Sequence, residues 1–577
     1  MIAPARRCLA GCAVLLVSFA LVDAARAQFA PPGRPGQRGL EETRPALPEF
    51  RPPPAPEIEL PPVAPPPARE PPLSAAVRVL VNEIRLTGNT VFGDAELAPI
   101  IAPYVGREIT TEELLDLRDA LTAYYVERGY VNSGAVIPDQ EVVEGVIEVQ
   151  IVEGELADIV VNGLTSLKPE FVIERIRLGA GPPLNVNQLR ERIQLLLLDP
   201  AIDRINARLG PGLGRGEGRL EVDIVEAPRY QPQVRFANDR SPAVGAEEIE
   251  VSASFGNIFG RSDPLRILLA VSKGLIEGSF DYSVPLTARD LRFFISGDVT
   301  HAKVVEDPFS EIDVESTSSS LQAGLSWPVI KTLDDEVRLE ALLEREATTT
   351  SLLGRRFSFS EGVDDGRTKI TALRLVQQWQ RRSQDQVIAL RSTESIGLDL
   401  PDTTKNSGNL PDGQFFAWLG QAQFARRLFG SDWQLVLRGD VQLSADPLLP
   451  IERIAIGGID TVRGYRENQL VVDSGWITSA ELRVPLGRLA VPGLSTDPDD
   501  GALQLVPFVD AGGGWNVDAP DPEDNVLYAA GAGLRWQLNQ RIDARVDYAP
   551  PLVNISTPDS NNLQDLALYF ELVMRFY

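Results

Sequence analysis

The sequence predicts a mainly β protein: a 16-stranded antiparallel transmembrane β-barrel at 229–577, preceded by two small α+β domains. Three observations support this prediction. From Tyr230 onward, apolar and polar residues alternate with period two in about sixteen stretches, many of them near the ten residues that a tilted membrane strand needs. The chain from 75 to 228 contains two stretches that repeat each other, and the first 27 residues resemble a secretory signal.

Residues 1–27 have the three parts of a signal peptide. Arg6 and Arg7 form a basic end, the apolar run AVLLVSFALV follows, and ARA precedes Gln28 as a cleavage site. The alternative is a lipoprotein box, LAGC, with Cys12 as the lipidated residue. That box should follow the apolar run, whereas here it precedes it, which favours a cleaved signal peptide.

The composition argues against several classes of protein. Both cysteines, Cys8 and Cys12, lie inside the expected signal, so the mature chain has no thiol, and His301 is the only histidine. We therefore expect no metal site, no cofactor and no enzyme activity. The net charge of −26 makes a general affinity for nucleic acid unexpected.

Residues 28–74 are dominated by proline, as in RPPPAPEIELPPVAPPPAREPPL. Proline fixes φ and removes a hydrogen-bond donor, so this segment is predicted to be a semi-rigid linker without a core.

The two repeated domains are predicted at 75–154 and 155–228, with a period of about 75 residues. Each copy has the pattern strand, helix, helix, strand, strand, and Thr110 with Glu113 forms a capping box before the second helix of the first copy. Aligned positions include Gly88 with Gly163, Thr90 with Thr165, and Glu153 with Glu226. The glycine-rich stretch at 209–219 suggests a phosphate cradle at first sight. A strand follows it instead of a helix, so we interpret it as a hairpin turn.

Alternation alone does not separate a membrane barrel from a soluble sandwich. In RIDARVDYAP at 541–550, for example, the apolar face could point inward or outward. Link lengths favour the barrel, because links after odd strands are mostly long and links after even strands mostly short. The long links are 303–315, 351–367, 399–412 and 446–473; the even link 487–500 is also long and does not fit.

The longest outer link, 446–473, contains GGIDTVRGYRENQL with Arg463 among glycines. Two strands later, LQLVPFVDAGGGW at 503–515 alternates so that Phe508 and Asp510 face the lumen. A carboxylate facing lipid would cost roughly 2 kcal/mol, which supports this orientation. If the loop folds inward, Arg463 can bind Asp510 through two nitrogens of its planar guanidinium.

These features together resemble one family, the TpsB transporters of two-partner secretion, the haemolysin-secretion type of POTRA-bearing outer-membrane barrels. The resemblance covers about 75 to 577 and makes the two repeats POTRA domains. It implies that the loop folds into the pore, with its arginine held by the aspartate of the strand motif. The residues that carry it are Val462, Arg463, Gly464 and Tyr465 in the loop, Phe508, Asp510 and Gly512 in the strand, and Phe570, Leu572, Met574, Phe576 and Tyr577 in the terminal strand signal.

The resemblance implies that the POTRA domains capture an unfolded, large TpsA-like exoprotein in the periplasm and that the barrel passes it to the cell surface. Outer-membrane lipid and, during biogenesis, the barrel-assembly machinery are the other expected partners. The alternative is a factor that inserts other barrels into the membrane, although such relatives commonly carry more than two POTRA domains. One departure is that only a short helix near 39–43 could serve as the plug that the family often has.

Overall fold

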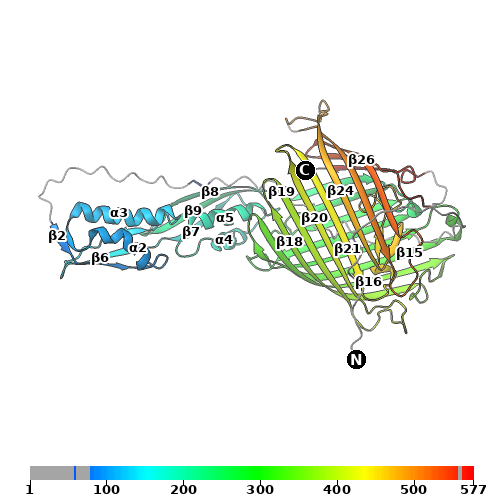
Figure 1. The fold of residues 1–577 in the computed structure, drawn as a ribbon, viewed down its shortest axis with the longest axis horizontal. Coiled ribbons are helices and arrows are strands. Elements are labelled where there is room, and N and C mark those ends of the chain that lie inside the picture. Colours follow the sequence, from blue (N-terminus) through cyan, green and yellow to red (C-terminus); the bar gives the residue numbers. More distant parts are fainter. Residues whose placement is uncertain (1–57, 60–77, 499, 556–561, 577) are drawn as a thin grey trace, which may run out of the picture.

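The computed structural model describes residues 58–59, 78–498, 500–555 and 562–576. The predicted signal peptide, most of the linker, the helix considered at 39–43 and Tyr577 lie outside the described residues. Two repeats follow one another as an arm that extends from one end of a large barrel (Figure 1). No helix among the described residues is long and apolar enough to cross a membrane.

In the first repeat, strands from the beginning and the end of the segment pair with each other, and two helices lie between them in the sequence. β3 pairs in parallel with β6, and β5 pairs antiparallel on the other side of β6. The predicted capping box is confirmed, because Thr110 Oγ1 accepts from the Glu113 N–H at 3.2 Å and the Glu113 carboxylate accepts from the Thr110 N–H at 2.8 Å. The elements are β2 (Arg78–Val81), β3 (Glu83–Thr87), α2 (Asp94–Ile101), β4 (Arg107–Thr110), α3 (Thr111–Glu127), β5 (Gly134–Val136) and β6 (Val146–Val152).

The second repeat has the same core order, with β7 parallel to β9 and β8 antiparallel to β9. The hairpin interpretation of the glycine-rich stretch is confirmed, since it joins β8 directly to β9. One finding was not predicted: β1 (Ile58–Glu59), from the proline-rich linker, pairs in parallel with β8 at the sheet edge. The elements are β7 (Glu155–Asn162), α4 (Pro169–Arg177), α5 (Val186–Leu197), β8 (Ile202–Pro211) and β9 (Glu217–Glu226).

The positions that repeat in sequence make the same contact in both copies. Glu226 accepts hydrogen bonds from the backbone N–H groups of Thr165, Ser166 and Leu167 at 2.7–2.9 Å. Burial would raise the pKa of Glu226, but the Ser166 hydroxyl and these N–H groups outweigh it and lower the pKa to about 2. Glu153 binds the corresponding turn of the first repeat through the N–H groups of Thr90 and Val91.

The two aligned glycines explain the shape of those turns. Gly88 and Gly163 have φ of +80° and +81°, and a Cβ on either would lie 2.4 or 2.2 Å from a backbone carbonyl oxygen of the neighbouring strand. Only glycine fits such a left-handed, closely packed position without strain.

The arm is fastened to the barrel at the short turn 286–291, which follows the fourth barrel strand. Arg175 of α4 is buried, stacks 3.7 Å from the Phe171 ring centroid, and donates to Asp290 at 2.7 Å. Asp290 also accepts from Lys331 at 2.6 Å. The junction is therefore a compact, charged contact with a carboxylate shared between two cations.

Sixteen strands close the barrel in sequence order, with β28 hydrogen-bonded to β10, so the predicted fold is confirmed. A two-residue strand, β17 (Arg355–Arg356), extends the link after β16. The sixteen are β10 (Tyr230–Ala237), β11 (Glu248–Phe255), β12 (Leu265–Ser272), β13 (Leu275–Pro285), β14 (Arg292–Lys303), β15 (Val314–Lys331), β16 (Asp335–Leu352), β18 (Arg367–Arg382), β19 (Gln386–Gly397), β20 (Phe416–Leu428), β21 (Trp433–Ser444), β24 (Ser474–Arg488), β25 (Ala502–Trp515), β26 (Val526–Asn539), β27 (Ile542–Tyr548) and β28 (Leu568–Arg575).

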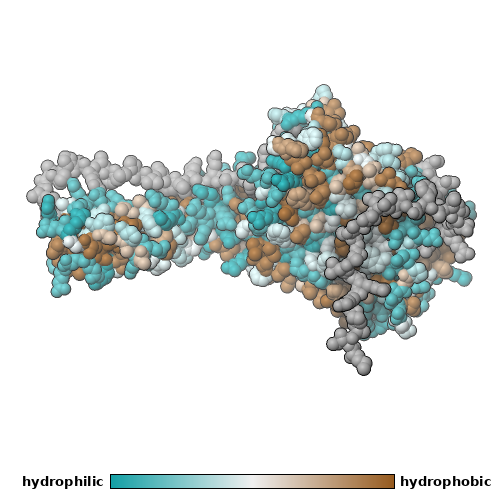
Figure 2. Space-filling model, viewed as in Figure 1, coloured by the Kyte–Doolittle hydropathy of each residue, from teal (hydrophilic) through white to brown (hydrophobic). Residues whose placement is uncertain are grey.

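The orientation of the alternating faces decides between sandwich and membrane barrel. In β27, Val546 and Tyr548 are 45% and 56% exposed on the outer wall, whereas Asp547 between them is fully buried inside. Apolar residues likewise cover much of the outer wall of the barrel, while the arm is largely hydrophilic (Figure 2). An apolar exterior around a charged interior is the arrangement that lipid requires.

Candidate functional site: the inward loop and its arginine

The link between β21 and β24 folds into the barrel and contains structure that the sequence did not predict. It carries a one-turn helix, η4 (Pro450–Glu452), and a small hairpin of β22 (Ile454–Ile456) and β23 (Leu470–Val472). The loop buries its own apolar cluster against the wall: Ile454, Ile456, Val462, Tyr465, Leu470 and Val472 pack with Ile477, Leu527 and Ala529. This burial offsets the cost of ordering a long loop.

The wall beneath the loop presents acceptors at regular spacing. β24 and β25 pair antiparallel with Ser479 opposite Asp510 and Glu481 opposite Phe508. Residues two apart on a strand share a face, so these four side chains form one inward-facing patch. Val509, between Phe508 and Asp510, points outward and is 56% exposed.

Arg463 lies on this patch and is 2% exposed. Its Nε and Nη2 donate to the two oxygens of Asp510 at 2.7 and 2.8 Å, and its backbone N–H donates to the same carboxylate at 3.2 Å. Nη1 donates to Glu481 at 2.8 Å, and Nη2 donates to Ser479 at 3.2 Å. The guanidinium carbon is 3.3 Å from the centroid of the Phe508 ring, so the plane of the cation stacks on the aromatic face.

A third carboxylate lies beside this contact. Asp547 on β27 lies 3.8 Å from Arg463 Nη1 and accepts from Arg535 and Arg545 at 2.5 and 2.8 Å. Arg463 is thus one cation in a ladder of alternating charges along the inner wall. Breaking one pair in such a ladder leaves a desolvated charge, which is costly.

Gly464 and Tyr465 fix the path of the backbone beside the arginine. Gly464 has φ of +94°, and a Cβ there would lie 2.2 Å from the Ala549 carbonyl oxygen. Its N–H donates to the Tyr569 hydroxyl at 3.0 Å, and that hydroxyl donates to the Tyr465 carbonyl oxygen at 2.6 Å. The Tyr465 hydroxyl donates to the Tyr528 carbonyl oxygen at 2.8 Å. Tyr569 thereby ties the loop to the last strand.

Val462 and Gly512 meet where the loop tip contacts β25. Val462 is fully buried, and a Cβ added to Gly512 would lie 3.0 Å from Val462 Cγ2 and 2.8 Å from Ile456 Cγ2. The glycine therefore leaves room for both loop side chains to approach the strand backbone.

Arg466 makes a further ion pair three residues after Arg463. Its Nε and Nη2 donate to the two Asp565 oxygens at 2.6 and 2.7 Å, and Nη1 lies 3.0 Å from Glu306. Both carboxylates belong to other links between barrel strands, so the loop tip also connects neighbouring outer loops.

The terminal-strand residues form part of the barrel closure. Phe570, Leu572 and Met574 lie in β28, which pairs with β10 over Glu571–Arg575, and the Phe570 ring packs 5.1 Å from Phe236 between ring centroids. Phe576 follows the strand and is 54% exposed. These residues lie apart from the Arg463 patch.

Sequence reasoning had not identified Glu481, Ser479, Tyr569 or Arg466. The first two have a usable signal, since they lie two apart in ITSAELRVPL, on the polar face of a strand adjacent to Asp510. The contacts of Tyr569 and Arg466 depend on where the loop lies in the folded barrel, which alternation does not predict. Among the described residues, no group of three or more His, Cys, Asp or Glu side chains could hold a metal ion.

Two family models match parts of this chain. A model described as haemolysin secretion/activation protein ShlB/FhaC/HecB matches residues 216–536, and a model of the POTRA domain, ShlB-type, matches residues 79–154. The outer membrane transporter CdiB of Escherichia coli is 26% identical over 488 residues, which cover 79% of this chain and 76% of the relative. The heme/hemopexin transporter protein HuxB of Haemophilus influenzae (strain 86-028NP) is 22% identical over 67% of this chain and 69% of the relative.

Solved structures show the same fold. CdiB from Escherichia coli has a TM-score of 0.65 at 21% identity, covering 88% of this chain and 92% of that structure. BamA from Haemophilus ducreyi, lacking POTRA domains 1–3, has a TM-score of 0.52 at 13% identity, covering 86% of this chain and all of that structure.

Proposed function

Because the chain belongs to the haemolysin secretion/activation family ShlB/FhaC/HecB, we propose that it exports one large, TpsA-like exoprotein across the outer membrane. The observation that carries this proposal is a closed barrel whose lumen is occupied by a loop fastened through buried ion pairs, with two repeats at one end. A 16-stranded barrel is wide enough for an aqueous channel, so the loop is the obstruction that export must move.

We propose that both repeats are POTRA domains, with borders at 75–154 and 155–228 and the barrel at 229–577. The POTRA family model covers the first repeat. The second is supported by equivalent contacts: Glu226 binds its turn as Glu153 does in the first repeat, and Gly163 packs against a strand as Gly88 does. The mature chain is proposed to begin after residue 27, with 28–74 as the linker.

Substrate capture in the periplasm would use strand addition to the edges of the repeats. Unpaired backbone groups of an edge strand bind an extended peptide through main-chain hydrogen bonds, with little sequence preference. The outer edge of β8 already accepts Ile58–Glu59 of this chain in parallel register, at Ala207 and Arg208. An extended segment therefore fits this edge.

Arg463 and Asp510 would form the latch of the loop in its resting position. The arginine travels with the loop and its partners stay on the wall, so outward movement must separate them. Val462, Gly464 and Tyr465 set the loop against the wall, while Phe508 and Gly512 supply the stacking surface and the space for close approach.

We expect two further partners, one at the outer wall of the barrel and one at its C-terminal strand. Lipid would cover the outward-facing apolar residues. The barrel-assembly machinery would recognise the C-terminal strand through Phe570, Leu572, Met574, Phe576 and Tyr577. We propose no enzyme activity, because the expected mature chain has no thiol and a single histidine.

The test compares the proteins of the medium, cell surface and outer membrane in a strain lacking this chain and in the complemented strain. Export predicts that one large protein disappears from the medium or surface while other barrel proteins keep their levels. A general fall in barrel proteins with no missing exoprotein would instead identify an assembly factor, and the export proposal would be wrong.

A further inference from the structure

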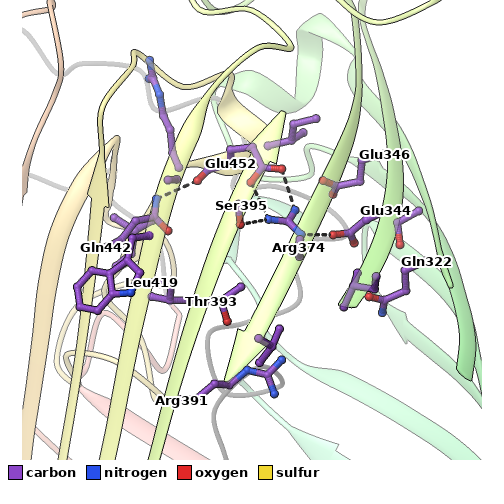
Figure 3. A pocket seen from close by; sticks show the side chains of 18 of the residues that line it. Gln322, Glu344, Glu346, Arg374, Arg391, Thr393, Ser395, Leu419, Gln442 and Glu452 are labelled. Carbon is purple, nitrogen blue, oxygen red and sulfur yellow. Dashed lines mark hydrogen bonds and ion pairs between the residues drawn. The ribbon is translucent and has the colours of Figure 1, made fainter. Parts of the chain in front are cut away.

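A cavity of about 200 Å³ lies inside the barrel at the root of the inward loop. Polar and charged side chains of β16, β18 and β19 line one side of it, and Glu452 of η4 lines the other (Figure 3). This place is distinct from the Arg463 patch, which lies on β24 and β25.

Arg374 on β18 lines this cavity and contacts both the wall and the loop. Its Nη2 and Nη1 donate to the two oxygens of Glu452 at 2.9 and 3.2 Å (Figure 3). Its Nε donates to Glu344 at 2.5 Å, and Nη1 donates to the Ser395 hydroxyl at 2.6 Å. The Arg374 and Glu452 side chains are 18% and 6% exposed, so the pair is largely removed from water.

Strand register explains why Arg374 keeps two partners on the wall. Ser395 is directly opposite Arg374 on β19, and Glu344 is diagonal to it on β16. Both therefore lie on the same inward face as Arg374, whatever the loop does. If Glu452 leaves, the guanidinium keeps a carboxylate and a hydroxyl and does not become an uncompensated buried charge.

We propose that Arg374 is a positioning residue that clasps the root of the loop through Glu452 and releases it when the pore opens. This inference rests on the proposed export function, since it assigns a second release point to the same loop. The two fastenings have opposite sense: the tip brings a cation to wall carboxylates, and the root brings a carboxylate to a wall cation. Because Glu452 lines the cavity, its departure from Arg374 also enlarges the open space beside β16–β19.

The Glu452 carboxylate can leave Arg374 while the backbone of the loop root stays in place. Gln442 donates to the Glu452 backbone oxygen at 2.9 Å, and Arg453 pairs with Asp473 at 2.9 Å, so the neighbouring backbone stays anchored when the Glu452 carboxylate lets go. The carboxylate is thus the part of the root whose contact can be exchanged for water.

The experiment records single channels of the full-length chain in planar lipid bilayers, with salt ions as the only probe. Glu452→Gln should raise the frequency of openings about tenfold or more, because a desolvated, charge-assisted pair is lost from the closed state alone. Glu340→Gln is the matched control: it removes a carboxylate from the same strand as Glu344, one that contacts Arg391 and Ser326 on the wall, and it should leave gating unchanged. Folding of each variant is checked by its heat-dependent migration in detergent gels.

A double-mutant cycle separates clasping from general stability. Arg374→Gln should raise the frequency of openings as Glu452→Gln does, and the two substitutions together should raise it no further than either alone, because both remove the same ion pair. The proposal is overturned if Glu452→Gln gates like wild type, if Glu340→Gln has the same effect, or if the effects of Arg374→Gln and Glu452→Gln multiply. These recordings need no exoprotein, so they can fail while the strain comparison still shows export.

Discussion

Removal of the Arg463 side chain should release the loop tip. Arg463→Ala deletes four side-chain hydrogen bonds to Asp510, Glu481 and Ser479 at a site that is 2% exposed. Breaking a buried pair costs about 3–5 kcal/mol. The lower value applies here, because Glu481 keeps Arg483 at 3.4 Å. About 3 kcal/mol shifts the balance between docked and released loop by about a hundredfold.

The assay measures how fast a cell-impermeant maleimide labels Val462→Cys on intact cells. Val462 is fully buried in the docked loop, and the expected mature chain has no other thiol. The labelling rate follows the released fraction when the loop moves rapidly, so it should rise about a hundredfold in the Arg463→Ala background. Arg355→Ala, which removes an exposed arginine from another long link, is the control and should have no effect.

Arg463→Lys distinguishes the geometry of the latch from its charge. One ammonium cannot reach both Asp510 oxygens and Glu481 in the fork arrangement that the guanidinium uses. Labelling should therefore be intermediate between wild type and Arg463→Ala. Labelling that stays at the wild-type rate in Arg463→Ala would refute the reasoning, since the ion pairs would then contribute nothing to holding the loop.

Three other predictions concern the backbone, the arm and its junction. Gly464→Ala should raise Val462→Cys labelling about tenfold, because a left-handed φ and a contact of 2.2 Å with the Ala549 oxygen disfavour any side chain; an unchanged rate would show that the turn can relax. Glu226 has a lowered pKa, so its contribution to the stability of the second repeat is present above its unfolded value of 4.5 and is lost as the pH falls toward about 2. Glu226→Gln should lower the melting temperature at pH 7 and reduce its decline between pH 4.5 and 2, followed by circular dichroism; equal curves would contradict this role. Asp290→Asn weakens the ion pairs to Arg175 and Lys331, so distances between spin labels on the second repeat and on the barrel should become more widely distributed; a distribution as narrow as wild type would show that other contacts hold the arm.

The sequence was sufficient for features that depend on periodicity. Alternation placed Asp510 and Asp547 on the polar face of their strands, and the length of a tilted strand led to the strand count. The repeat alignment singled out Glu153 and Glu226 before their contacts were known, because each must satisfy the same turn. Such features are local, so neighbouring residues along the chain specify them.

The sequence did not predict these contacts between segments that are far apart along the chain. The hairpin of β22 and β23 forms because the lumen wall buries its apolar residues, and nothing in the loop itself requires it. The contact between Arg374 and Glu452 joins a wall strand to a loop root 78 positions away. The pairing of Ile58 with β8 likewise needs an edge strand supplied by the second repeat.

The most direct measurement is export with the loop locked in place. Val462→Cys and Gly512→Cys join the loop tip to β25, where a Cβ at 512 lies 3.0 Å from Val462 Cγ2, a spacing compatible with a disulfide. Ile456→Ala is added to both states, because the new Cβ would otherwise lie 2.8 Å from Ile456 Cγ2. The same variant is compared oxidised and reduced, so any effect of the substitutions themselves cancels. A loop-gated pore predicts that oxidation stops surface appearance of the exoprotein found by the strain comparison and that reduction restores it. Equal export in both states would contradict the claim that the loop must leave the lumen.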